Sequence, residues 1–459
     1  MSRIALTVIA PYLVTLLIPA KALCADEVLV WNAIAAQTIV GPGGANKVPP
    51  LGLVDFAIVH TAIYDAVNAI SGSPHKQYAV QPSVNSPASP AAATAAAAHD
   101  VLLALYPSQA EALNAQYATS LSTIPEGDAK TNGISVGQQT AAGILALRAN
   151  DGRNAGTPIT EPAPAPGVWV RTPPGFLPPQ APWARNITPW LMSTPSQFRT
   201  PPPPSLDSDL WVSDYNLTKT LGAAVGSART PDQTDIGKFW ADQPILQWNR
   251  GWRGVSISRG LSLQQNARFF AMLTTASSDS LIGCWDSKYT YLFWRPVTAI
   301  RQGGGNPALT ADPSWIGEVV TPNHPEYPAA HGCFSAAVTH VMAFFFGVEF
   351  GDDEEATFSF TLDSNVPGLA RPVRSYTSLF QALDEVLRAR IYGGMHYRNS
   401  TLKGAELGQR VARLSKQRFA CNDDGEDDDR CRDGDDDHGS GDMDDGARRD
   451  HDDDGSDDL

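Results

Sequence analysis

The chain has 459 residues, with 49 acidic and 34 basic side chains and a formal net charge of −15. That length allows one large hydrophobic core or two smaller ones, and the acidic balance does not favour nucleic acid as a partner. Residues 422–459 contain 19 acidic side chains against 4 arginines, so the rest of the chain is close to neutral.

Residues 1–25 have the pattern of a secretory signal peptide. Arg3 precedes an apolar stretch over residues 4–20, and small residues follow at Ala22 and Ala25. This pattern predicts cleavage near Ala25 and a secreted or periplasmic protein. We expect no membrane insertion after cleavage, because no later stretch is expected to be long and apolar enough to span a bilayer.

Residues 26–157 are predicted to form an N-terminal helical region. Apolar residues recur at helical spacing over residues 54–70, 91–105 and 135–148, and an alanine-rich run strengthens the second of these. Residues 158–207 should then form a Pro-rich, irregular connecting segment. They include 15 of the 36 prolines, which excludes long helices there.

A second set of helices is predicted in residues 208–420. The ranges with helical spacing are 214–225, 263–300, 332–346, 375–390 and 402–419. Strand-like alternation is scarce. We therefore predict an all-α protein, with a helix-bundle catalytic region over residues 208–420.

Residues 421–459 are predicted to be an acidic, disordered tail. This Asp- and Gly-rich run cannot bury enough apolar surface to fold. It would serve as a solubilising tail, or its clustered carboxylates would bind divalent cations weakly, as calcium prefers oxygen ligands.

Five cysteines are present, and signal cleavage would remove Cys24. The other four allow three disulfide pairings in an exported chain. A bond between Cys421 and Cys431 closes the shortest loop. Free, buried thiols at Cys284 and Cys333 are an equally good interpretation of the second pair.

Five charged or titratable residues fall in three short segments of the second helical region. The segments read KYTYLFWRP, PAAHG and RIYGGMH, and the residues are Lys288, Arg295, His331, Arg390 and His396. Guanidinium groups and an ammonium match the charge of a tetrahedral oxyanion, and an imidazole can bond to it or protonate it. We interpret the set as a pocket for phosphate or an anion shaped like phosphate.

The spacing within each segment predicts how these side chains meet. If residues 288–295 lie on one helix, Lys288 and Arg295 are two turns apart on one face. His331 precedes an apolar run and should lie near a helix start, where the N–H of Ala330 would also attract an anion. In the third segment the arginine and histidine are six residues apart, so a turn at the two glycines between them is needed.

A helical lysine or a single histidine is more often a solvated or a core residue than part of a site. Here the residues between Lys288 and Arg295 are mostly aromatic, so unpaired charges beside them would be costly. The order of the three segments within about 110 residues favours a functional site.

The three segments resemble the signature of the vanadium-dependent haloperoxidase and type 2 phosphatidic acid phosphatase (PAP2) superfamily, usually written K-x6-RP, PSGH and SR-x5-H-x3-D. Four other segments also resemble soluble, secreted haloperoxidase-like members, namely WNAIAAQTIV, HTAIYDAVNAI, PGVWVRTPPGF and HPEYPAAHG. The resemblance covers most of residues 30–420. It implies helix bundles of the PAP2/vanadium haloperoxidase type.

The resemblance also implies a role for each site residue. Lys288, Arg295 and Arg390 would hold the equatorial oxygens of vanadate or phosphate. His396 would bond to the central atom, and so be the ligand of the metal, and His331 would be the acid–base group.

The chain departs from the superfamily pattern at four positions. These are Ala329 and Ala330 in place of serine and glycine, Ala389 in place of serine, and Ser400 in place of aspartate. The backbone N–H of Ala330 would replace the missing hydroxyl as an oxygen donor. Without the aspartate, His396 needs another partner to set its tautomer and basicity.

Two chemistries fit such a pocket, because vanadate and phosphate share shape and charge. With vanadate, hydrogen peroxide would oxidise a halide to hypohalous acid. With phosphate, His396 would attack a phosphate monoester and form a phosphohistidine. The long N-terminal region and the Pro-rich segment favour the haloperoxidase, the phosphatase is the alternative, and a secreted cation-binding protein with a degenerate pocket is a third reading.

Overall fold

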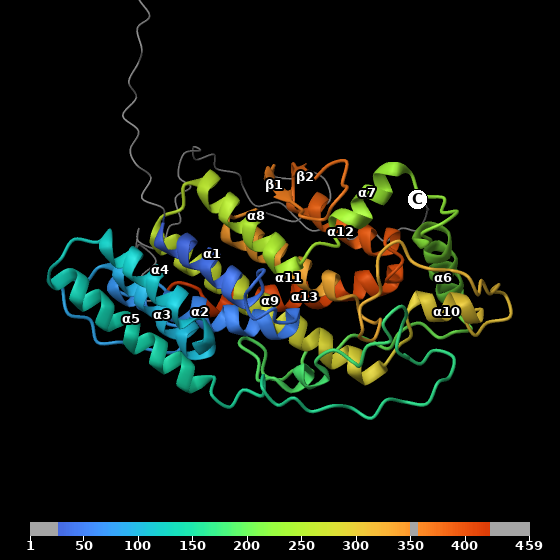
Figure 1. Ribbon diagram of the computed structural model, residues 1–459, viewed down its shortest axis with the longest axis horizontal. Coiled ribbons are helices and arrows are strands. Elements are labelled where there is room, and N and C mark those ends of the chain that lie inside the picture. The colour runs from blue at the N-terminus through green and yellow to red at the C-terminus, as the bar shows by residue number, and fades with distance from the viewer. Residues whose placement is uncertain (1–25, 349–356, 423–459) are drawn as a thin grey trace, which may run out of the picture.

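The computed structural model describes residues 26–348 and 357–422. Within these ranges the chain forms thirteen α-helices, two short 3-10 turns and one pair of strands, so the predicted all-α class is confirmed. The predicted signal peptide and all but two residues of the predicted tail lie outside the described residues. Figure 1 shows an elongated molecule with α3, α4 and α5 at one end, α11 and α13 near the centre, and α6 and α10 at the other end.

Five helices make up the N-terminal region. They are α1 (Glu27–Ile39), α2 (Pro49–Ile70), α3 (Pro90–Leu105), α4 (Ala110–Ser122) and α5 (Asp128–Leu147), with the 3-10 turn η1 (Pro107–Gln109) before α4. The sequence analysis did not predict α1 or α4. In α4 only Leu113 and Ser120 are buried, so the helix has no apolar stripe that a periodicity could detect.

Among the described residues, α2 is the one helix long and apolar enough to cross a membrane by length and composition. The expectation that no such segment would follow the signal peptide was therefore wrong. In this structure 94% of its most apolar window is buried inside the protein, where it packs on α3, α5 and α9. Its apolar residues thus face other helices on all sides.

Residues 158–207 contain one short 3-10 helix, η2 (Pro182–Asn186), and are otherwise irregular. Asp279 of α9 (Leu263–Tyr291) holds part of this segment in place. Its carboxylate accepts the backbone N–H groups of Trp190, Leu191 and Met192, at 2.7 to 2.8 Å. The prolines prevent a helix, and these bonds give the segment a fixed path across α9.

The remaining helices form the second half of the molecule. Besides α9 they are α6 (Asp209–Gly222), α7 (Pro231–Phe239), α8 (Pro244–Arg259), α10 (Pro296–Gln302), α11 (Ala330–Phe345), α12 (Leu379–Tyr392) and α13 (Arg398–Arg418). The antiparallel strands β1 (Phe360–Asp363) and β2 (Val373–Tyr376) pair Phe360 with Tyr376. The start predicted for α12 at residue 375 is thus wrong, and α7 and α8 were not foreseen.

The single helix predicted over residues 263–300 is also wrong. α9 ends at Tyr291, and Leu292 adopts a left-handed conformation with φ of 49°. Arg295 is extended and is the N-cap of α10, which begins at Pro296. A proline cannot continue a helix, and it disfavours helical conformation in the residue before it. Lys288 and Arg295 therefore lie on different elements.

α11 and α13 pack so closely that their backbones touch. A Cβ added to Gly404 of α13 would lie 2.6 Å from the carbonyl oxygen of Ala329, and one added to Gly408 would lie 2.2 Å from that of Cys333. One cluster of buried side chains also runs continuously from α1 to α3 through α9 to α11 and α13. This packing fixes the N-terminus of α11 in the middle of the molecule.

Candidate active site

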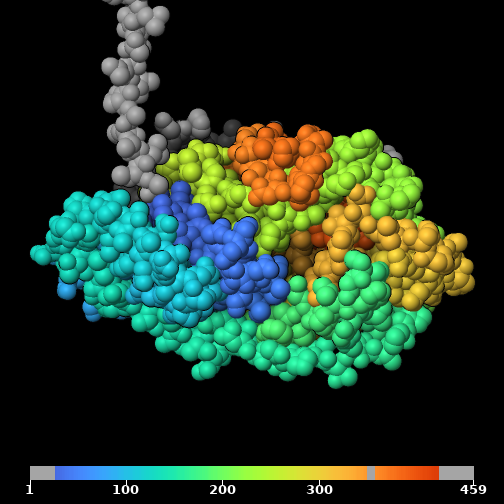
Figure 2. Space-filling model, in the orientation of Figure 1, coloured from blue at the N-terminus to red at the C-terminus, as the bar shows by residue number. Residues whose placement is uncertain are grey.

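A cavity of about 410 Å³ opens where the two halves of the molecule meet. Four of the predicted site residues line it, namely Ala330, His331, Arg390 and His396. In Figure 2 a hollow lies between blue N-terminal, yellow-green and golden residues, with darker orange-red residues at its base. Lys288 and Arg295 are fully buried and are not among the residues that line the cavity.

His396 is held in place by a glutamate that the sequence reading missed. The ring nitrogen Nδ1 of His396 lies 2.8 Å from Oε1 of Glu326, which also accepts the backbone N–H of Tyr397 at 3.1 Å. Burial, reinforced by the nearby cations, holds the pKa of His396 well below its ordinary value. A neutral ring that donates from Nδ1 has its lone pair on Nε2, the atom that would bond an electrophilic centre.

Glu326 is fully buried between the cations and the histidine. Burial raises its pKa to about 7, while Lys288, Arg295 and the Ser400 hydroxyl lower it. Ser400 stands where the superfamily signature has aspartate, so Glu326 supplies the carboxylate from another segment. The HPEYP sequence just before the second motif was the available signal, since a glutamate between two prolines beside a predicted site must be paired if it is buried.

Arg295 contacts the other side of the same histidine. Its guanidinium lies 3.1 Å from Nε2 of His396 and donates to the backbone carbonyls of Met395 and His324, each at 2.9 Å. Burial lowers the pKa of Arg295 to about 10, so the group is still charged at neutral pH. It would meet any atom that bonds to Nε2.

Lys288 takes a different place from the one predicted. Its ammonium donates to the carbonyls of Pro325 and Glu326, both at 2.9 Å, and of Pro328, at 2.5 Å. Burial lowers its pKa to about 8. All three of its N–H bonds are used, so Lys288 fixes the loop that carries Glu326 and adds positive potential from behind the wall.

Arg390 reaches the cavity from the last turn of α12. It donates to the carbonyl of Trp240 at 3.0 Å and contacts the sulfur of Met395 at 3.2 Å, while its Nε has no partner among the described residues. Burial lowers its pKa to about 9. The predicted turn after α12 is confirmed, because Gly394 has φ of +73° and brings His396 back beside Arg390.

His331 lies in the first turn of α11, as predicted. Its Nε2 is buried and has no hydrogen-bond partner in the described part of the chain. Burial and the neighbouring Arg390 hold its pKa well below the ordinary value. No described side chain caps this helix, so the first N–H groups, including that of Ala330, are available to an anion.

A third histidine, His324, was not predicted. It lines the cavity, its ring packs on Trp285 with centroids 4.9 Å apart, and its Nδ1 lies 3.0 Å from the Arg295 guanidinium. Burial, with Lys288 and Arg295, lowers its pKa well below the usual value. His324 precedes the glutamate in HPEYP, so the same segment could have indicated both residues.

Known proteins that are similar to this chain include vanadium haloperoxidases. A family model described as the VCPO second helical-bundle domain matches residues 268–421. The vanadium chloroperoxidase of Curvularia inaequalis is 24% identical over 481 residues, which cover 81% of this chain and 78% of that protein. The second helical bundle thus matches this family model, and the similarity to a vanadium chloroperoxidase extends over most of the chain.

Two solved structures of vanadium haloperoxidases share the fold. The first bacterial vanadium-dependent iodoperoxidase superposes with a TM-score of 0.72 at 24% identity, covering 86% of this chain and 96% of that one. A holo-type bacterial vanadium-dependent chloroperoxidase gives 0.61 at 16% identity, covering 81% and 91%. The similarity thus includes the N-terminal half as well as the bundle.

The described residues at the site fit a bound oxyanion. Three cations, Lys288, Arg295 and Arg390, are buried here, and the carboxyl group of Glu326 interacts with the first two. Polar atoms that lack partners, such as Nε2 of His331, lie at the same cavity. Uncompensated positive charge and unpaired donors are costly when buried, and a bound anion would offset both.

Proposed function

We propose that this protein is a vanadium-dependent haloperoxidase, which oxidises halide with hydrogen peroxide to hypohalous acid. The observation that carries the proposal is the neutral His396 at the cavity, whose Nδ1 is held by Glu326 and whose Nε2 lies 3.1 Å from the Arg295 guanidinium. The haloperoxidase reading is further supported by the likeness to vanadium chloroperoxidase, which extends over 81% of the chain.

In this proposal His396 would bond vanadate through Nε2, and Glu326 would hold the ring in the required tautomer. Arg295, Arg390 and the N–H of Ala330 would hold its oxygens, and Lys288 would add charge from behind. When bound, vanadate supplies the activation of peroxide for oxygen transfer to halide.

His331 would move protons at its Nε2 atom. Its low pKa makes the ring neutral and able to accept a proton from a ligand in the cavity, then return it when the product leaves. Its neighbour Arg390 disfavours the protonated ring, so the proton would not remain there. His331 would thus act on rate more than on anion affinity.

The alternative is a PAP2-type phosphatase that cleaves phosphate monoesters through a phosphohistidine. The dyad of Glu326 and His396 favours it, because a carboxylate that orients a neutral histidine also prepares Nε2 for attack on phosphorus. His331 would then protonate the leaving group. The same cations would stabilise the charge of the transition state.

Two assays on one preparation separate these functions. The purified protein, loaded with orthovanadate, should brominate phenol red with peroxide and bromide, and activity should disappear when vanadate is omitted. In parallel it should hydrolyse p-nitrophenyl phosphate only weakly. Strong hydrolysis without vanadate-dependent bromination at any pH tested would replace the proposal with the phosphatase.

We also propose that the protein is exported across the cytoplasmic membrane and is secreted or periplasmic. The signal-like residues 1–25 support it. N-terminal sequencing of the exported protein should begin near residue 26. Calcium titration of chains with and without residues 423–459 would show whether the acidic run binds divalent cations.

A further inference from the structure

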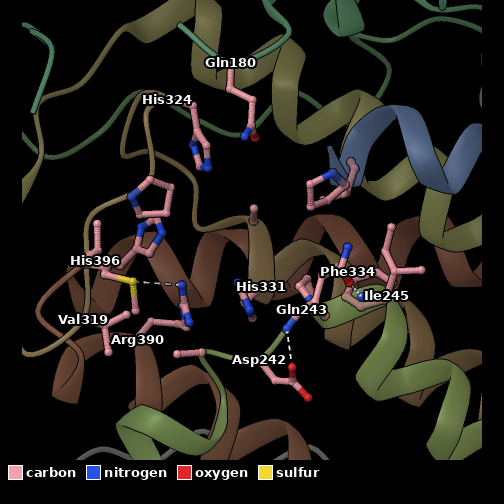
Figure 3. Close-up of a pocket in the computed structure, with 18 of the residues that line it drawn as sticks. Gln180, Asp242, Gln243, Ile245, Val319, His324, His331, Phe334, Arg390 and His396 are labelled. Carbon is pink, nitrogen blue, oxygen red and sulfur yellow. Dashed lines mark hydrogen bonds between the residues drawn. The ribbon is translucent and has the colours of Figure 1, made fainter. Parts of the chain in front are cut away.

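Among the described residues that line the cavity, Met395 is the one that carries sulfur. Its thioether sulfur lies 3.2 Å from the guanidinium nitrogen Nη2 of Arg390, and Figure 3 draws this contact as a dashed line between the yellow sulfur and Arg390. A thioether is only a weak hydrogen-bond acceptor. The Nη2 donor of Arg390 is therefore weakly satisfied, next to an Nε that has no partner in the described part of the chain.

The backbone around Met395 fixes the position of its side chain. The N–H of Met395 donates to the Arg390 carbonyl at 3.2 Å, and its carbonyl accepts from Arg295 at 2.9 Å. Gly393 leaves room for the thioether methyl group, because a Cβ added to this glycine would lie 2.7 Å from Cε of Met395. The turn that brings His396 to the cavity thus also holds the sulfur beside Arg390.

The other three methionines of the described residues lie elsewhere. Met192, Met272 and Met342 are at most 5% exposed, belong to the main hydrophobic core and do not line the cavity. Met395 is just as well shielded from the outer surface, with 1% of the residue exposed. The difference between the four is the open space beside Met395, so a small reagent that enters the cavity meets this sulfur first.

Small oxidants are the reagents that the proposed function brings to this place. It consumes hydrogen peroxide and makes hypohalous acid, and an oxidant of either kind converts a thioether to a sulfoxide. With peroxide, the oxygen–oxygen bond breaks, a sulfur–oxygen bond forms, the sulfur loses two electrons and the second oxygen leaves as water. With hypohalous acid, the sulfur gains an oxygen, the halogen takes up the two electrons, and halide and a proton are released.

A sulfoxide at Met395 would change what Arg390 can bind. Oxidation turns the flexible apolar side chain into a polar one, and its new oxygen accepts a hydrogen bond from Nη2 far better than the thioether does. In the proposed function Arg390 holds an oxygen of the anion. The sulfoxide oxygen would compete for that donor from within the protein, at a distance that the present 3.2 Å contact already provides.

We propose that Met395 is an oxidation site of this protein, at which peroxide or hypohalous acid forms a sulfoxide that occupies Arg390 and weakens anion binding. The proposal goes beyond the proposed function and takes from it only the source of the oxidant. Oxidant in excess would then limit the activity of the site that uses or makes it. Because a methionine sulfoxide can be reduced again, the limit is reversible.

Oxidant added to the resting protein tests the modification without any turnover. The protein, with neither vanadate nor halide present, is treated with increasing hydrogen peroxide or hypobromous acid, and its peptides are analysed by mass spectrometry. The mass of one oxygen atom should appear on the peptide of Met395 before it appears on those of Met192, Met272 and Met342. Equal oxidation of all four, or oxidation of Met395 after the others, would overturn the proposal.

Anion affinity tests the consequence. After most of Met395 is oxidised and the oxidant is removed, isothermal titration of orthovanadate should give a dissociation constant about tenfold higher, the effect of one hydrogen bond to a charged group. Met395→Leu, which nearly conserves side-chain volume, should give the same constant before and after treatment. Met342→Leu is the matched control, because Met342 is fully buried in α11 and does not line the cavity. It should lose affinity as the wild type does.

Two results of that titration would contradict the proposal. One is an unchanged affinity of the wild type although Met395 is oxidised, which would mean that the sulfoxide does not occupy Arg390. The other is an equal loss of affinity in treated Met395→Leu, which would place the damage at another residue.

Turnover then distinguishes this proposal from the proposed function. If bromide is oxidised, the wild type loses activity as the sulfoxide accumulates and Met395→Leu keeps a larger share of its own initial activity, both hold. If bromide is oxidised and Met395 stays unmodified, the haloperoxidase stands and the oxidation site is wrong. If no halide is oxidised or orthovanadate does not bind, the haloperoxidase fails. The order of oxidation by added reagent, and the affinity for inorganic phosphate before and after it, then decide the proposal alone.

Discussion

Two buried charge clusters in this protein have opposite balances. In the N-terminal half, Arg148 and Arg153 contact Asp151 at 3.0 and 2.9 Å, and Arg153 also lies 3.5 Å from Asp55. Two cations thus meet two carboxylates. At the active site three buried cations meet one carboxylate among the described residues. A balanced cluster is complete without a ligand, whereas an unbalanced one needs an anion.

The buried histidines differ in the same way. His60 of α2 lies between the rings of Phe56 and Phe270, and its Nε2 is 3.0 Å from the amide of Asn32. Burial lowers its pKa to about 3. His331 and His396 are equally neutral, but they line a cavity. A low pKa alone therefore does not mark a functional histidine, and open space beside the ring does.

The largest effect is expected from His396→Ala. We expect it to reduce activity to background and to abolish bound vanadium or phosphoenzyme, because the bond to Nε2 is lost. His60→Ala should instead lower the free energy of unfolding by about 3 kcal/mol, with turnover per folded molecule retained. Elemental analysis for vanadium and urea unfolding measure the two effects.

A normal vanadium content in His396→Ala would show that the axial bond is made elsewhere. Loss of turnover in correctly folded His60→Ala would show that the N-terminal histidine also belongs to the site. Either result would remove the contrast between a packed histidine and one at a cavity.

The second prediction concerns His331→Ala. Proton transfer by a positioned group contributes about 10²–10⁴-fold to rate, so kcat should fall by that amount. The N–H groups at the start of α11 remain, and anion affinity should stay near the wild-type value. Equilibrium binding of vanadate and steady-state kinetics on the same variant test this. If the variant instead lost vanadate affinity and kept the wild-type kcat at saturating vanadate, His331 would be assigned to anion binding.

The sequence predicted the helical class, the turn at Gly394 and the helix start at His331, because each depends on local residue types. It did not predict the break between Lys288 and Arg295 correctly, although Pro296 was a clear stop signal. Apolar residues on both sides of the break continue one helical pattern, since Phe293 and Trp294 are buried by other segments. Periodicity reports burial, and burial continues where the helix does not.

The partner of His396 depends on tertiary structure. Glu326 is 70 residues away in the chain and reaches the ring only because Lys288 holds residues 325–328 beside it. A spacing rule that looks four residues after the histidine finds Ser400 and nothing ionisable. The same holds for the cavity, where Leu53 of α2 and Ile245 of α8 approach from other parts of the chain.

A third prediction compares two arginines directly. Arg390→Met removes an uncompensated charge, so without an anion the free energy of unfolding should stay within about 1 kcal/mol of the wild type, while vanadate affinity falls about 100-fold. Arg148→Met leaves Asp151 with one partner fewer and should destabilise by about 3 kcal/mol, with affinity unchanged. Urea unfolding and vanadate titration of both variants should show that Arg390→Met loses affinity but not stability, and that Arg148→Met loses stability but not affinity. Destabilisation of Arg390→Met as large as that of Arg148→Met would mean that its charge is already balanced.

The smallest effect on vanadate affinity among the active-site variants should come from Glu326→Gln. Glu326 is the carboxylate of the unbalanced cluster. Glutamine keeps an oxygen that can accept from Nδ1 of His396, so vanadate affinity should fall only about tenfold.

The pH dependence of stability sharpens the assignment. Burial raises the pKa of Glu326 to about 7 from an ordinary 4.5, so between these values the folded protein holds a proton that the unfolded chain has lost. The stability that this group contributes is therefore full below about pH 4.5, falls as pH rises, and is lost above about 7. Glutamine does not titrate in this range. Other carboxyl groups whose pKa is raised, such as Asp279 with a pKa of about 6, are present in both the wild type and the variant, so their effect cancels in a difference.

The free energy of unfolding of the wild type minus that of Glu326→Gln, measured without oxyanion, should thus decline between pH 4.5 and 7 and be flat above pH 7. A difference that is flat throughout would mean that Glu326 is ionised at its ordinary pKa, with its charge fully balanced by the cations before any anion binds.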